Sequence, residues 1–135
     1  MSTDSWRPTH AYVPGQNSRH EEGAFDFLKV GVAGCSVAAL PGTVAWRSAM
    51  AFHRDGYHWE AHELLEAIWM ACPPNSAEKI YVKAVIQQCN AALKEKMRQP
   101  VAAQKIRVQA EALLHEALRR SGGVLFGGLV DATEI

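Results

Sequence analysis

The sequence has no excess of charge of either sign, because its 14 basic residues balance its 14 acidic residues. Proteins that bind nucleic acid usually show a basic excess or a basic stripe. The local basic clusters, Lys94–Arg98 and Arg119–Arg120, stand where we expect helices to end, and they suit helix dipoles or solvated surface. We therefore expect no nucleic-acid partner.

Cysteines are few, and no two of them form a CxxC motif. This pattern is typical of free thiols in a reducing compartment. The three cysteines are Cys35, Cys72 and Cys89. The sequence also contains no glycine-rich phosphate loop and no GxSxG motif, so it offers no ready nucleotide site or serine nucleophile. We treat the three thiols as small apolar side chains.

Long hydrophobic runs are missing as well. The most apolar stretch, Val30–Trp46, is short for a membrane span and is broken by Pro41 and several glycines. It follows a polar, partly acidic segment, unlike the apolar part of a signal peptide. We expect it to form a loop that covers the core of a cytoplasmic protein, with no membrane partner.

What the sequence does contain is helical periodicity. Apolar side chains recur at helical spacing over about 43–53, 57–70, 76–97 and 100–121. Thr43 and Ser76 are suitable N-caps, Pro100 suits a first turn, Gly56 suits a left-handed C-cap, and Ser121-Gly122-Gly123 ends the last helix. These patterns predict an all-α fold, a compact bundle of about four helices in which short loops favour antiparallel neighbours.

The chain length fits a single domain. Residues 1–40 are expected to form an extended N-terminal arm and the covering loop. Residues 41–121 would form the helical core, and residues 122–135 a short C-terminal tail packed on it. Within the arm, Arg19 and His20 could fold onto the bundle, with Arg19 free to pair with a carboxylate.

The second predicted helix carries the densest group of side chains capable of chemistry. These are His58, Glu60, His62, Glu63 and Glu66. The i, i+4, i+8 spacing of His58, His62 and Glu66 predicts one half-buried stripe along the edge of the apolar face. Glu60 and Glu63 are expected to point toward the opposite, wetter side.

Three functions are compatible with this group. The first is a binding or scaffold domain with a polar pocket between the second and third helices, for a small ligand. Its predicted lining is His62, Glu66, Gln87, Trp69, Glu60 and Gln88. The second is a metal-dependent, hydrolase-like enzyme with His62 and Glu66 as ligands, His58 as a further candidate ligand and Glu63 as a weak catalytic candidate for a general base.

The divalent cation of such a metal-dependent enzyme would be zinc, iron or manganese, which suit imidazole and carboxylate ligands. The zincin pattern is absent, because Glu66 stands where a second histidine is needed. The third function is a structural dimerisation module, in which the chain forms a homodimer and the polar cluster is a buried network.

The segment Phe52–Trp69 contains the motif Glu-Ala-His-Glu-x-x-Glu at Glu60–Glu66, and Val85–Gln88 reads Val-Ile-Gln-Gln. Together these blocks resemble the bacterial family known as domain of unknown function 309. The resemblance covers roughly residues 10–120. It implies a compact helical bundle in which the His-Glu motif faces the glutamine helix, and it implies no activity. The chain departs from the family pattern at His53, where an asparagine is usual, at Lys83 and Ala84, where many members have Gln-Gly, and at Lys94, where many have a histidine.

Overall fold

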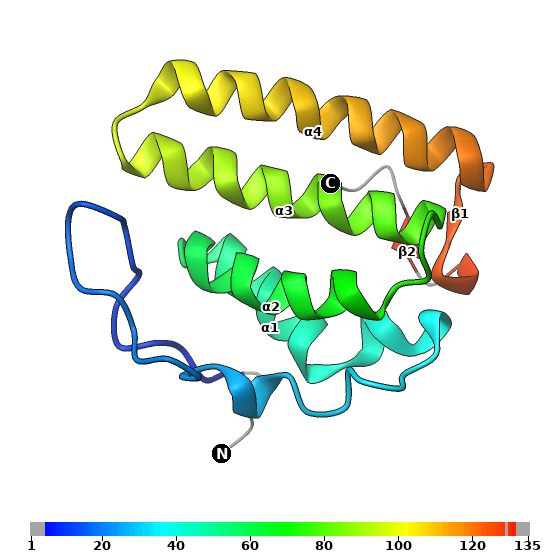
Figure 1. Ribbon diagram of the computed structural model, residues 1–135, viewed down its shortest axis with the longest axis horizontal. Helices are drawn as coiled ribbons and strands as arrows, with labels where there is room; N and C mark the ends of the chain where they lie inside the picture. The colour runs from blue at the N-terminus through cyan, green and yellow to red at the C-terminus, as the bar shows by residue number, and fades with distance from the viewer. Residues whose placement is uncertain (1–4, 129, 132–135) are drawn as a thin grey trace.

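The computed structural model describes residues 5–128 and 130–131 of the chain. Its four α-helices are α1 (Val44–Arg54), α2 (His58–Ala71), α3 (Ala77–Lys96) and α4 (Pro100–Ser121). Consecutive helices pack as neighbours, α1 on α2, α2 on α3 and α3 on α4, and Figure 1 shows α3 and α4 as a long antiparallel hairpin. The predicted all-α bundle of four helices is confirmed. Among the described residues, no helix is both long and apolar enough to cross a membrane.

Local capping explains where the helices begin and end. The hydroxyl of Thr43 accepts a hydrogen bond from the Trp46 amide at 3.2 Å, and the hydroxyl of Ser76 accepts one from the Lys79 amide at 3.1 Å. Each bond satisfies an amide that the first helical turn leaves without a partner. Gly56, with a φ of +95°, follows the end of α1 in a backbone conformation that side chains disfavour. These predicted caps are confirmed.

The hydrophobic core lies mainly between α1, α2 and α3. Its fully buried side chains include Phe52, Leu64, Ile68, Val82 and Cys89. Helix α4 packs on α3, its buried side chains are the alanines one heptad apart, Ala103, Ala110 and Ala117, and Ala117 belongs to the core. Small side chains at this spacing let two helices approach closely. The outer surface of α4 leaves Val101 and Val108 exposed, and homodimerisation stays a prediction.

The N-terminal arm lies on the body of the protein, beside α1 and α2 (Figure 1). Trp6 packs against the rings of Phe25 and Phe52 at centroid distances of 6.1 Å and 6.0 Å. Arg7 forms an ion pair with Asp55 at 2.9 Å. These contacts fix the arm over the turn that joins α1 to α2.

The segment between the arm and α1 buries Val32 and Leu40. It contains the short 3-10 helices η2 (Asp26–Leu28) and η3 (Val37–Gly42). The tail contains β1 (Val124–Leu125), η4 (Phe126–Gly128) and β2 (Val130–Asp131), in which β1 and β2 pair antiparallel. Leu125 and Phe126 are fully buried, whereas residues 129 and 132–135 of the predicted tail lie outside the described residues.

Candidate functional site

The acidic and imidazole side chains of the α2 motif divide between two faces of the helix. Glu60 and Glu63, three residues apart, belong to the side that the arm covers. His62 and Glu66, four residues apart, belong to the side that faces α3. One helical motif therefore contributes to two separate polar regions.

The position of Glu60 differs from the sequence-based expectation. Glu60 is fully buried, not turned to the wetter side, because the arm folds over that side of α2. Its Oε2 accepts hydrogen bonds from the Tyr12 backbone amide at 2.7 Å and from His20 Nε2 at 2.6 Å. The partners that make its burial tolerable thus come from the arm.

The rings of three other side chains surround the imidazole of His20. Its side chain is only 8% exposed. The ring of His10 stacks on it at 4.3 Å, the ring of Trp59 lies 6.0 Å away at a small angle, and Phe25 meets it edge-on at 5.0 Å. Nε2 bonds to Glu60, whereas Nδ1 has no hydrogen-bond partner among the residues that the structure describes. These contacts hold the imidazole in place, and Nδ1 is the ring nitrogen that they leave without a hydrogen bond.

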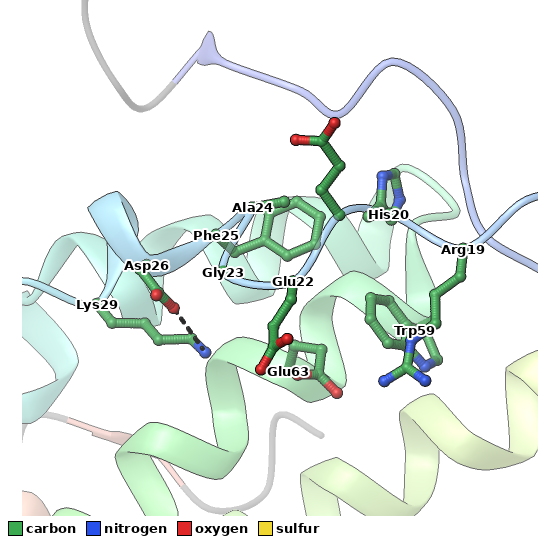
Figure 2. A pocket seen from close by; sticks show the side chains of 11 residues that line it. Arg19, His20, Glu22, Gly23, Ala24, Phe25, Asp26, Lys29, Trp59 and Glu63 are labelled. Carbon is green, nitrogen blue, oxygen red and sulfur yellow. Dashed lines mark ion pairs between the residues drawn. The ribbon is translucent and has the colours of Figure 1, made fainter.

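His20 also lines a pocket of about 480 Å³ between the arm and α2 (Figure 2). Glu63 enters this pocket from α2, and Glu22 and Arg19 enter from the arm. Both the lysine and the arginine of the lining already have partners: Lys29 lies 3.6 Å from Asp26, and the Arg19 guanidinium lies over the Trp59 ring at 5.6 Å. The pocket is therefore polar, with carboxylates that are not all neutralised by the cations beside them.

The second polar region is a hollow of about 300 Å³ between α2 and α3. His62 Nε2 and Glu66 Oε1 lie 2.8 Å apart at its edge, with side chains 23% and 54% exposed. The Glu66 side chain is more exposed than the half-buried position that its helical spacing predicted. The remaining lining residues are Trp69, Met70, Lys83, Ile86 and Asn90.

The glutamines of α3 lie apart from this hollow. Gln87 accepts a hydrogen bond from Asn90 at 2.9 Å and donates one to Gln109 of α4 at 3.3 Å, so it bridges α3 and α4. Gln88 is half-buried. The structure thus places His62, Glu66 and Trp69 of the predicted pocket together, Glu60 under the arm and Gln87 toward α4. That these residues bind a ligand stays a prediction.

His58 has a different neighbour from the one that the stripe predicted. Its Nδ1 lies 2.8 Å from the Nδ1 of His53 at the end of α1. Burial lowers the pKa of His53, and burial together with the charge of His53 lowers the pKa of His58 to about 4. Across the described part of the chain, no three His, Cys, Asp or Glu side chains converge as metal ligands do. The metal site with His62, Glu66 and His58 stays a prediction.

A family profile described as "Domain of unknown function (DUF309)" matches residues 46–106. This segment resembles the DUF309 family. The predicted resemblance is confirmed there, and the DUF309 segment runs from Trp46 in α1 to the second turn of α4. No curated protein and no solved structure matches the chain.

The DUF309 segment contains Glu60 and Glu63, but it does not contain the arm that supplies His20, Tyr12 and Arg19. The sequence indicated that His20 could fold onto the bundle, but not that its partner is Glu60. A buried carboxylate is visible only once the covering segment is placed, because the helical pattern of α2 alone puts Glu60 away from the apolar face.

Proposed function

We propose that this chain is a ligand-binding protein that holds a small, amine-bearing molecule in the pocket between the arm and α2. The observation that carries the proposal is His20, a nearly buried polar side chain in the wall of the pocket with an unpartnered Nδ1. A volume of about 480 Å³ lies within the usual size of small-molecule sites.

The hydrogen-bonding role of His20 follows from its partner. Glu60 Oε2 acts as an acceptor toward the Tyr12 amide and toward His20 Nε2, so Nε2 carries the proton. In a neutral imidazole with the proton on Nε2, Nδ1 is an acceptor. Because Nε2 is taken up by Glu60, Nδ1 is the ring nitrogen left to accept a hydrogen bond, which suits a ligand that donates one.

The charges in the pocket favour the same class of ligand. Glu21, Glu22 and Glu63 line it without an ion pair among the described residues, while Asp26 and Lys29 offset one another. Arg19 is the remaining cation. The lining is therefore negative on balance, and a positively charged ammonium group would be attracted to it.

The experiment measures the melting temperature of the purified chain with three probes of similar length: 1,4-diaminobutane, 1,4-butanediol and succinate. A ligand that binds only the folded chain raises the melting temperature. We expect a concentration-dependent rise with the diamine and no rise with the diol or the dianion. No rise with the diamine, or an equal rise with all three, would refute the proposal.

Two variants locate the site without disturbing the buried pair. Glu63→Gln and Glu22→Gln each remove one carboxylate from the pocket wall and keep its shape. We expect both to weaken the response to the diamine. Glu111→Gln, at an exposed position of α4, is the matched control. Equal responses in all three variants would place binding elsewhere.

A further inference from the structure

A pair of histidines lies at the turn between α1 and α2, outside the arm pocket and its proposed ligand. His53 is in the last turn of α1, and His58 is the first residue of α2. The turn is tight, because the Tyr57 amide donates to the Phe52 carbonyl at 2.8 Å and Gly56 adopts its positive φ. Both imidazoles are thus mounted on the ends of two packed helices.

The two rings direct the same nitrogen at one another. Their Nδ1 atoms lie 2.8 Å apart, and the rings are inclined at 68° with centroids 4.8 Å apart. In the chain as it stands, one Nδ1 donates its hydrogen to the lone pair of the other. Neither Nδ1 has another hydrogen-bond partner within the described residues.

Both rings are partly withdrawn from solvent. They are half-buried, and the pKa of each is lowered, in both cases chiefly by burial. An imidazole ligates a cation through an unprotonated nitrogen, and the contact between the two Nδ1 atoms already leaves one of them without a hydrogen. The charged side chains that act on His58 from α3, Lys96 and Glu95, have opposite signs.

We propose that His53 and His58 form a two-imidazole site for a divalent transition-metal cation, with the two Nδ1 atoms as its protein ligands. Zinc bound to histidine lies about 2.0–2.1 Å from the nitrogen, which places two tetrahedral ligands about 3.3 Å apart. The two Nδ1 atoms need to separate by about half an ångström, and the rings need to tilt so that both lone pairs meet at the cation. Water completes the coordination, because the pair is half-buried and not enclosed.

The protons balance without a change in either ring's charge. The shared Nδ1 hydrogen leaves its nitrogen and a proton is returned from solvent to the Nε2 of the same ring, so that ring stays neutral. Both Nδ1 lone pairs then point at the cation. The site uses His58, as the sequence-based metal hypothesis did, but it pairs His58 with His53 in place of His62.

Isothermal titration of the full chain with Zn²⁺ tests the site, using His53→Asn and His58→Gln. Asparagine is the residue usual at position 53 in the resembling family, so His53→Asn removes the imidazole while suiting the turn. His62→Ala and His115→Ala are the controls, since they remove histidines at other places on α2 and α4. Melting curves recorded with a chelator confirm that each variant is folded.

We expect the unsubstituted chain and both controls to bind one Zn²⁺ per chain. The two pair variants are expected to lose more than the roughly 10- to 100-fold in affinity that removal of an outer-shell partner causes. Nitrogen chemical shifts of the histidines should move at the Nδ1 atoms of His53 and His58. No Zn²⁺ binding by the unsubstituted chain, undiminished binding in both pair variants, or loss confined to His62→Ala would each overturn the proposal.

Discussion

His20 Nε2 and Glu60 Oε2 lie 2.6 Å apart although 40 positions separate the two residues in the sequence. The bond joins the arm, which lies outside the DUF309 segment, to the first turn of α2, which lies within it. Glu60 is fully buried. Within the described residues, its carboxylate forms two hydrogen bonds, this one and the one from the Tyr12 amide, and both come from the arm. The arm therefore supplies contacts on which the packing of α2 depends.

A double-substitution cycle on this pair tests that conclusion. His20→Ala leaves a buried carboxylate without its side-chain partner, and loss of one partner of a buried pair typically costs about 3–5 kcal/mol. Glu60→Gln in the same background removes the stranded charge, so we expect the double variant to lose less than the sum of the single variants. Urea unfolding followed by circular dichroism provides the free energies. Strictly additive losses would mean that the two side chains do not depend on one another.

The burial of the His53–His58 pair should make the free energy of unfolding depend on pH. The pKa of His58 is lowered to about 4 in the folded chain, mainly by burial, whereas an unfolded histidine titrates near 6.5. Between these two values the unfolded state binds more protons, so stability falls as the pH drops from about 6.5 toward about 4. We expect His58→Gln to reduce this loss.

Urea midpoints at about pH 7 and about pH 5 measure the effect, with chelator present to exclude metal. His115→Gln is the matched control, because His115 is exposed on α4. If His58→Gln and His115→Gln show the same pH dependence as the unsubstituted chain, the His53–His58 contact does not govern acid stability.

The cysteines should differ in reactivity. Burial raises the pKa of the Cys72 thiol to about 11 and that of Cys89 to about 12, while Cys35 is only half-buried. Alkylation requires the thiolate and access to it. We expect iodoacetamide to label Cys35 in the native chain well before the other two, and all three after denaturation, as read by mass spectrometry. Equally fast native labelling of Cys72 or Cys89 would contradict this assignment.

The seam between α3 and α4 should tolerate little added volume. Ala110 is 1% exposed against α3, so Ala110→Leu forces the helices apart and should destabilise the chain by about 1–3 kcal/mol. Ala112→Leu makes the same chemical change at an exposed position of α4, and its effect should stay within about 0.5 kcal/mol. Equal unfolding free energies for the two variants would show that the alanine seam is loosely packed.

The fold class could be predicted because its signals are local. The Thr43 and Ser76 caps, the Gly56 turn and the first-turn Pro100 act within a few residues of their own positions, and each marks a helix end. The apolar period of α2 likewise fixed which of its side chains enter the core. The prediction failed at Glu60, since helical periodicity describes one helix against one core and contains no information on a covering segment.

By itself the sequence determined the four helices, their caps and their order, and it identified the α2 motif as the place where polar side chains gather. Only the tertiary structure decided that Glu60 is buried under the arm, that Glu63 belongs to the arm pocket, and that His58 meets His53. The physical reason is range: helix formation is settled by hydrogen bonds and side chains a turn apart, whereas the surroundings of a polar side chain depend on which distant segment packs over it.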